Sequence, residues 1–292
     1  MEAKYHIKET GTDGDYTDLA FERRRACPDS EGIEYRRECC SVGQWERVRV
    51  TSEAGARSLG RPIGIYDSLC LGRMDRLDYE ERDDTAEEVA KELCRICDSE
   101  EIYPDRILVV GLGNAELTPD SVGAESAALV RPTLQIKNDD ESLFLSLECS
   151  EIAVIRCDVK ARSGIDACEV VRGVANRINP DMIIAIDALA ARSAERLGTT
   201  IQISSTGIHP GSGIGNLRGR IDEYTLGIPV IAIGVPTVIN SRVFVSVGDE
   251  VRAPRSDEGL LVCPTAIGEI TKAAAEIIAR GINQAFGLDI EY

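Results

Sequence analysis

Two aspartates of the chain each follow a short apolar run. Asp187 comes directly after the run at 182–186, and Asp120 comes one short loop after the run at 107–110. Such runs predict strands that are buried on both faces, as in a parallel sheet. Open α/β sheets hold their ligand crevice at the carboxyl ends of the strands, so we expect both carboxylates in one crevice. Such a pair can carry chemistry, because two close carboxylates share a proton: the ionised one can activate water while the protonated one donates to a carbonyl oxygen.

Asp120 has a second interpretation that concerns structure alone. Thr118 has the features of a helix N-cap, Pro119 those of a first helical residue, and Asp120 those of a first-turn carboxylate that complements the helix dipole. If Asp120 instead belongs to a reactive pair, the same helix terminus makes it the easier of the two to ionise. Asp120 is then the expected general base.

The loop at 206–216 contains four glycines and His209, one of the two histidines of the chain. Glycines let a backbone come close to a ligand, so Gly211, Ser212 and Gly213 are candidates for holding an extended substrate or for part of an oxyanion site. His209 is expected to anchor the loop or to assist catalysis. A serine triad is not expected, because His209 is too near Ser212 in the sequence.

Motifs of other hydrolases and of nucleotide-binding proteins are absent from the sequence. It contains neither His-Glu-x-x-His nor a phosphate loop that ends in Gly-Lys-Ser/Thr. Gly111-Leu112-Gly113-Asn114 follows a predicted strand, but a dinucleotide fingerprint needs glycine where Glu116 stands. We expect no metal and no cofactor.

Composition restricts the partners and the location. The 33 basic and 50 acidic residues give a net charge of -17, which argues against binding to nucleic acid or to an anionic membrane surface. No stretch is apolar enough to cross a membrane and no signal peptide is recognised, so we expect a cytoplasmic protein. The ten cysteines are expected to be reduced, and even Cys94 and Cys97, which have redox spacing, are interpreted as small hydrophobic residues.

The fold predicted around these residues is a single α/β domain with a largely parallel sheet flanked by helices. Its core spans 85–292 and follows a small β-containing region at 19–84. Thr85 and Glu88 form a capping-box pattern, so a long helix is expected to begin at Thr85 after a charged connector. The Ala-rich segment after Asp187 favours a helix. Further predicted elements are strands at 152–155, 200–204 and 229–235, a turn at Pro236, a helix that stops at Asn179, and a last helix that ends near Gly287.

Several long motifs resemble the germination protease family of spore-forming bacteria. The resemblance is close from about residue 107 to residue 237 and weaker before residue 85. The motifs are Val-Val-Gly-Leu-Gly-Asn at 109–114 with Thr-Pro-Asp at 118–120, Ile-Ala-Ile-Asp-Ala-Leu-Ala-Ala-Arg-Ser at 184–193, Thr-Thr-Ile-Gln-Ile-Ser at 199–204, the loop at 206–216, and the segment 226–237.

This resemblance implies an endopeptidase that degrades small acid-soluble spore proteins at germination, in the cytoplasm of the forespore and spore core. It implies an atypical aspartic peptidase whose two catalytic aspartates fall on Asp120 and Asp187. It also implies a fold of phosphorylase/hydrolase type, related to that of the hydrogenase-maturation peptidases, and assembly as a homotetramer.

The resemblance also implies a zymogen that removes a short N-terminal propeptide by self-cleavage. The family prefers an acidic residue followed by an apolar residue and alanine, and Asp18, Leu19 and Ala20 fit this preference. The predicted processing bond therefore lies between Asp18 and Leu19. Residues 1–18 are the predicted propeptide, and residues 19–292 the peptidase domain.

Two alternatives remain open from the sequence. A hydrogenase-maturation-like peptidase would use Asp120, Asp187 and His209 as metal ligands, and its cleavage would depend on metal. A noncatalytic nucleotide- or phosphate-binding protein would use 111–114 as a phosphate cradle, and nucleotides would shift its thermal unfolding. The Ala-Glu-Leu run at 115–117 departs from the family pattern, which leaves substrate selectivity and assembly open.

Overall fold

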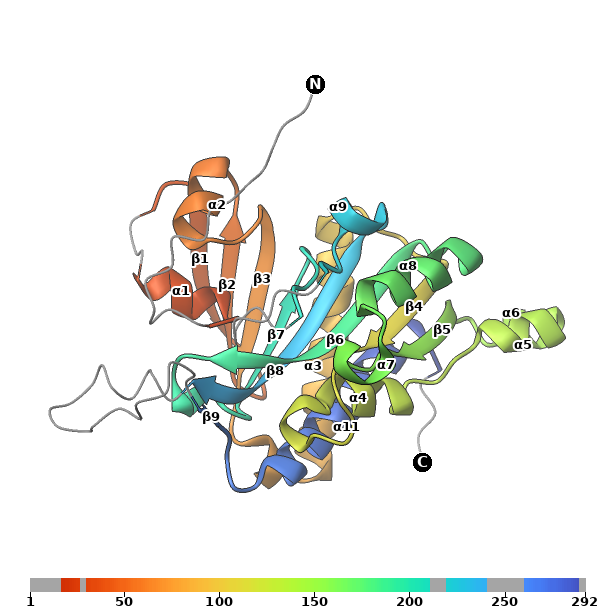
Figure 1. Ribbon diagram of the computed structural model, residues 1–292. Helices are drawn as coiled ribbons and strands as arrows, with labels where there is room; N and C mark the ends of the chain where they lie inside the picture. The colour runs from red at the N-terminus through yellow and green to blue at the C-terminus, as the bar shows by residue number, and fades with distance from the viewer. Residues whose placement is uncertain (1–16, 27–29, 211–218, 241–259, 289–292) are drawn as a thin grey trace, which may run out of the picture.

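The computed structural model describes residues 17–26, 30–210, 219–240 and 260–288, which form one sheet between two layers of helices (Figure 1). In this part of the chain the sheet has nine strands. Their order across the sheet is β1 (Ile33–Cys39), β2 (Gln44–Val50), β3 (Gly64–Cys70), β7 (Thr200–Ser204), β8 (Val230–Asn240), β6 (Met182–Ala191), β4 (Arg106–Gly111) and β5 (Glu151–Arg156), while β9 (Leu261–Val262) pairs with β8.

The sheet has a parallel half and an antiparallel half. β8, β6, β4 and β5 run parallel to one another. β1, β2, β3 and β7 are joined antiparallel, and β7 connects them to β8. The predicted α/β class with flanking helices is confirmed. The N-terminal β region is part of the main sheet rather than a separate one, because β3 pairs directly with β7.

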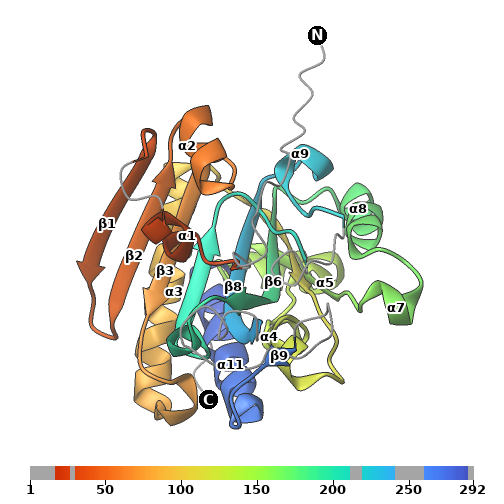
Figure 2. The ribbon, with the colours of Figure 1, turned by 60° about the vertical axis from the view of Figure 1, so that its left-hand side comes forward.

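Helices cover both faces of the sheet (Figures 1 and 2). On one face, α3 (Tyr79–Ser99), α4 (Val122–Leu129) and α11 (Ile267–Phe286) pack their apolar side chains against the strands. On the other face, α8 (Ala167–Ile178) covers the parallel half, while α1 (Ala20–Ala26) and α2 (Glu53–Leu59) cover the antiparallel half. We call this second face, which α1, α2 and α8 cover, the site face.

Shorter helical elements connect the strands and the long helices. They are α5 (Leu134–Asp139), α6 (Glu141–Ser146), α7 (Lys160–Ser163), α9 (Glu223–Leu226) and the 3-10 turns η1 (Met74–Arg76), η2 (Thr118–Asp120) and η3 (Ala194–Arg196). Among the residues that the structure describes, no helix has both the length and the apolar character that crossing a membrane requires.

β6 is longer than the sequence predicts. The Ala-rich segment after Asp187 is strand rather than helix, because β6 stays paired with β8 as far as the pair of Ala191 with Ile239. Asp187 therefore lies inside β6 and not at its end. Alanine favours a helix in an isolated segment, but pairing with a neighbouring strand overrides that preference here. β8 likewise continues past Pro236, which lies at a shift in the pairing register, where a sheet tolerates proline.

α3 begins earlier than the sequence predicts. Asp78 accepts a hydrogen bond from the Glu81 N–H, and the Glu81 side chain accepts one from the Asp78 N–H, so these two residues form the capping box. Thr85 lies within the helix, where its hydroxyl donates to the Glu81 carbonyl at 2.6 Å. The charged residues before Thr85 are thus the start of the helix and not a connector.

The connection from β4 to α4 places one glycine against the backbone of β6. Leu112, just after β4, donates its N–H to the Ile186 carbonyl at 2.8 Å. Gly123, in the first turn of α4, lies on the same carbonyl, since a Cβ there would be 2.2 Å from the Ile186 oxygen and 2.4 Å from the Leu112 oxygen. The loop that carries Asp120 therefore begins and ends against the residue that precedes Asp187.

Replacing Gly123 with alanine is expected to lower the free energy of unfolding by about 1–3 kcal/mol, because backbone atoms occupy the space of the new methyl group. Urea unfolding measures this change. Gly173 in α8 is the matched control, because no atom outside its own stretch of helix backbone lies within 4 Å of the place where its Cβ would stand. Alanine at Gly173 is expected to stabilise the protein by up to about 1 kcal/mol. Equal effects of the two substitutions would contradict the close approach of α4 to β6.

Candidate active site

Asp187 shares the site face with Gln202. Asp187 on β6 pairs with Gly234 on β8, and Gly234 pairs with Gln202 on β7. Directly paired residues of neighbouring strands turn their side chains to the same face. Asp187 and Gln202 therefore stand in one row across three strands, with a glycine between them. Both are buried, with 4% and 8% of their surface exposed, and Asp187 Oδ1 accepts the Ala188 N–H at 2.9 Å.

Asp120 is the last residue of η2, which packs against β6 and β8 at the carboxyl end of β4. The Thr237 hydroxyl on β8 donates to the Pro119 carbonyl at 2.6 Å and ties η2 to the sheet. Asp120 Oδ2 accepts the Asn114 N–H at 2.9 Å. The structure thus brings together the segments that carry Asp120 and Asp187, while the sharing of a proton between these carboxylates stays a prediction.

The local structure around Asp120 differs from the predicted helix start. Ser121, and not Thr118, stands at the N-cap position of α4, and η2 forms a separate 3-10 turn before it. Asp120 is therefore not in the first turn of α4. The Asn114 N–H donates to the Asp120 carboxyl group from the loop before η2, not from the first turn of α4.

The predicted cleavage sequence lies on the site face along the end of β6. The Asp18 N–H donates to the Ala190 carbonyl at 2.9 Å, and the Ala190 N–H donates to Asp18 Oδ2 at 2.9 Å. The Gln202 side chain holds the segment from β7, since Nε2 donates to the Asp18 carbonyl at 3.0 Å and Oε1 accepts the Ala20 N–H at 2.9 Å. The bond between Asp18 and Leu19 is thus fixed between β6 and β7.

Charged side chains hold this segment on both sides of that bond. The Arg61 guanidinium lies 3.6 Å from Asp18 Oδ1 and donates to the Thr17 carbonyl at 3.1 Å. Further along, the Glu22 carboxylate accepts the Thr17 hydroxyl at 2.5 Å. It also accepts two N–H groups just after β6, those of Arg192 at 2.8 Å and Ser193 at 3.1 Å.

The residues that follow the predicted bond belong to the hydrophobic core. Leu19, Ala20 and Phe21 are buried among apolar side chains of α2, β2, β3 and β6. Figure 2 shows α1 lying on β2 and β3, with the chain before it running toward β8. Residues 17–22 are therefore an integral part of the fold.

His209 lies after β7 and interacts electrostatically with Asp18 and Arg61. The pKa of His209 is lowered to about 4, mainly by burial and also by the charges of Arg220 and Arg61, while the charges of Asp222 and Asp18 oppose the change. His209 is therefore neutral at pH 7, with one ring nitrogen as donor and the other as acceptor.

The other candidates in the loop after β7 are Gly211, Ser212 and Gly213, and they lie outside the described residues. Within the described ranges, no three side chains of His, Cys, Asp or Glu are grouped so that they could hold a metal ion. Asp120, Asp187 and His209 accordingly do not form such a group.

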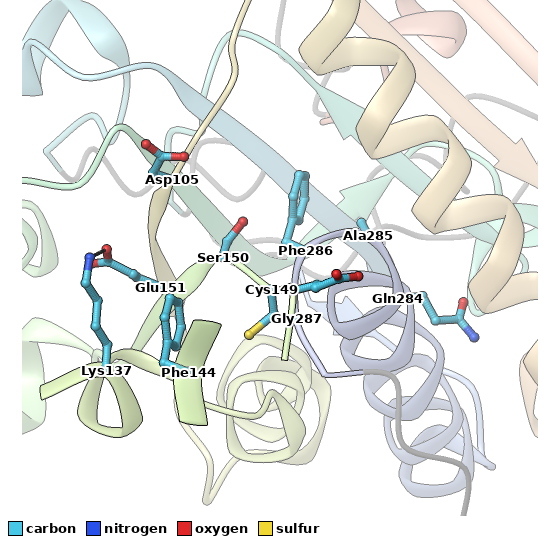
Figure 3. Close-up of a pocket in the computed structure, with 11 residues that line it drawn as sticks. Asp105, Lys137, Phe144, Cys149, Ser150, Glu151, Gln284, Ala285, Phe286 and Gly287 are labelled. Atoms are coloured by element: carbon cyan, nitrogen blue, oxygen red, sulfur yellow. Dashed lines mark hydrogen bonds and ion pairs between the residues drawn. The ribbon is translucent and has the colours of Figure 1, made fainter. Parts of the chain in front are cut away.

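The pocket in Figure 3 lies at the amino ends of β4 and β5, whereas Asp120 lies beyond the carboxyl end of β4. It has a volume of about 400 Å³ and is formed where β4 and β5 begin and where α11 ends. Lys137 and Glu151 on its wall pair with each other, and burial raises the pKa of the Cys149 thiol, which keeps it protonated. None of the candidate site residues lines this pocket.

The sequence does not single out Gln202 or Arg61, although both contact the predicted cleavage segment. Gln202 stands between two isoleucines in the alternating run at 200–204, and this alternation is the one signal that its side chain faces away from the apolar side. Arg61 carries no local signal, because its partner Asp18 lies far away in the sequence.

Comparisons with known proteins agree with the motifs. A family model described as germination protease matches residues 17–251. The chain is 36% identical to the germination protease of Caldanaerobacter subterraneus subsp. tengcongensis, over 92% of this chain and 93% of that protein. It is 33% identical to the germination protease of Clostridium perfringens over 82% of each chain, and 42% identical to that of Priestia megaterium over 66% of this chain and 52% of that one.

One solved structure, the [NiFe] hydrogenase maturation protease HycI from Thermococcus kodakarensis, aligns with 64% of this chain and 99% of its own, at a TM-score of 0.36 and 16% identity. The assignment to a family depends instead on the sequence matches. They extend over most of the chain and include Asp18, Asp120, Asp187 and Gln202. The chain therefore belongs to the germination protease family.

Proposed function

We propose that this protein is an endopeptidase that degrades small acid-soluble spore proteins at germination, and that it is made as a zymogen that cuts its own chain between Asp18 and Leu19. Membership of the germination protease family supports a protease with a role in germination. The observation that carries the finer proposal is the position of the segment around this bond. It is paired with a strand end and held on both sides by Gln202, as a bound peptide substrate would be.

The proposed reaction divides acid–base work between two aspartates. Asp120, as a carboxylate, takes a proton from a water molecule whose oxygen attacks the carbonyl carbon of Asp18. Asp187 keeps its proton, which burial favours, and donates a hydrogen bond to the carbonyl oxygen. The C–N bond then breaks, and the Leu19 nitrogen takes up the transferred proton. The products are a carboxyl group on Asp18 and an amine on Leu19.

The proposed partners are protein substrates and further copies of this chain. The net charge of -17 makes direct binding to DNA unfavourable, so the coat proteins rather than the spore DNA are the proposed target. A homotetramer in the forespore and spore core, with residues 1–18 masking the site, completes the proposal through the family resemblance.

The first test is self-cleavage of the full-length chain, followed by intact mass spectrometry. We expect one cut, between Asp18 and Leu19, and a loss of rate of about 100-fold or more in Asp187→Asn and in Asp120→Asn, because each removes one acid–base group. Asp139→Asn, at an exposed position of α5, is the matched control and should cut at the unmodified rate. Cutting at that rate by Asp187→Asn would refute the aspartate mechanism. Cutting that stops with a chelator and returns with nickel would favour a metal-dependent peptidase.

The second test concerns His209 and its protonation. The unfolded chain binds this proton near pH 6.5 and the folded chain only near pH 4, so stability is lost as pH falls from about 6.5 toward 4. The NMR shifts of the His209 ring should therefore not change between pH 8 and pH 6, and His209→Asn should lose less stability than the wild type between pH 7 and pH 5. Titration of His209 near pH 6.5 would show that the ring is not buried as described.

A further inference from the structure

We propose that Gln202 and Arg61 position the bond to be cut: Gln202 donates a hydrogen bond to the carbonyl oxygen of that bond, and Arg61 recognises the acidic side chain before it. This inference rests on the proposed cut between Asp18 and Leu19. It assigns two side chains of this protein to two features of the predicted cleavage sequence, the carbonyl of the bond and the acidic residue before it.

The Gln202 amide forms one hydrogen bond on each side of Leu19, the residue after the bond. A glutamine amide has a donor and an acceptor side by side, so it can pair with the carbonyl of one residue and the N–H of the second residue beyond it. Only one orientation of this amide satisfies both the Asp18 carbonyl, at 3.0 Å, and the Ala20 N–H, at 2.9 Å. β7 pairs with β3 on one side and with β8 on the other, so the position of Gln202 is fixed by two neighbouring strands.

The same hydrogen bond is placed where charge develops during the reaction. When water adds to the carbonyl carbon of Asp18, negative charge collects on the carbonyl oxygen, and a donor about 2.7–3.1 Å away stabilises it. Gln202 Nε2 already occupies such a position. Asp187 stands in the same row on the same face, two strands away or about 10 Å between Cα atoms, and the Leu189 side chain covers the glycine between them.

Arg61 supplies a charge that only an acidic side chain satisfies. Its guanidinium lies 3.6 Å from one carboxylate oxygen of Asp18, and the Ala190 N–H donates to the other oxygen. Arg61 also donates to the Thr17 carbonyl at 3.1 Å, so it contacts the backbone as well as the side chain. Among the described residues its Nε is buried without a hydrogen-bond partner. Asparagine in place of Asp18 would keep the shape and the bond from Ala190 but would lose the attraction to the guanidinium.

A double-mutant cycle on self-cleavage tests the assignment of Arg61. Asp18→Asn should slow the cut by about 10- to 100-fold in the wild type, because a charge-assisted contact is lost. In the Arg61→Gln background, chains with and without Asp18→Asn should be cut at similar rates, because the charge that distinguishes the two side chains is absent. Arg57→Gln, at an exposed position of α2, is the control and should keep the preference for Asp18. An undiminished preference in Arg61→Gln would overturn the assignment.

Substitution of Gln202 tests the donor. Gln202→Glu keeps the size and the acceptor for Ala20 but places an acceptor against the carbonyl of Asp18. It should slow the cut by about 100- to 1000-fold, and by the same factor whether Asp or Asn precedes the bond. Gln202→Asn should also be cut more slowly than the wild type, because the shorter asparagine side chain cannot reach both the Asp18 carbonyl and the Ala20 N–H. Gln135→Glu, an exposed glutamine of α5, should have no effect. Cutting by Gln202→Glu at the wild-type rate would refute the donor role.

Amide hydrogen exchange in the Asp187→Asn chain separates this inference from the proposed function. There the segment stays uncut, and the Ala20 amide should exchange at least about tenfold faster when Gln202→Ala removes its acceptor. If the unmutated chain does not cut itself, the proposed function fails and the role of Gln202 in cutting fails with it, whereas protection of Ala20 by Gln202 would still support binding of the segment. If cutting occurs and neither exchange nor rate responds to Gln202, the inference fails and the proposed function stands.

Discussion

The backbone pairing of β6 with β8 beyond Asp187 is the constraint on which the site depends. This pairing continues to Ala191, so β6 extends past the end of β4 and presents the backbone of Ala190 on its free side. Buried N–H and C=O groups that lack partners are costly, and Asp18 satisfies both groups of Ala190. The position of the N-terminal segment thus follows from the length of β6. A β6 that ended at Asp187 would leave that segment without a place on the sheet.

Close packing at two glycines gives this arrangement its precision. Gly123 lets α4 rest on the Ile186 carbonyl, and Gly234 leaves its side of β8 to the Leu189 side chain, which would lie 2.5 Å from a Cβ at that position. Both glycines stand where a methyl group has no room. The row of Asp187, Gly234 and Gln202 is therefore set by strand register and not by flexible side chains. Rigid strands thus hold the residues that we propose to act in catalysis.

The sequence predicts those parts of the fold that local patterns determine. Helical periodicity and an αL stop at Asn179 define α8, and the strands at 152–155 and 200–204 are confirmed as β5 and β7. Where two local patterns compete, the prediction fails: α3 has a capping box at Asp78, seven residues before the similar pattern that starts at Thr85. The strand after Asp187 is not predicted at all, because its partner in β8 lies far away in the sequence.

In the candidate site, too, the sequence predicts what local patterns determine and misses what distant contacts determine. Asp120 and Asp187 stand out because each follows an apolar run, and the segment around Asp18 stands out through its match to the family's cleavage preference. Arg61 and Gln202 become visible only when the fold brings α2, β6 and β7 around that segment. Contacts between distant parts of the chain carry no periodicity, so no inspection of the sequence alone would pair these residues with Asp18.

The N-terminal segment is covalently attached to the rest of the fold, so it competes with separate peptides for the contacts that hold it. A segment attached by a short linker is present at its own site at an effective concentration of about millimolar or above. Any separate peptide that needs Ala190, Gln202 and Arg61 must displace a tethered rival that never diffuses away. Leu19, Ala20 and Phe21 are buried in the core and lie on the other side of this bond from Asp18. Removal of the residues before Leu19 therefore vacates Arg61 and Ala190 for an incoming chain, while the Ala20 N–H continues to compete for Gln202.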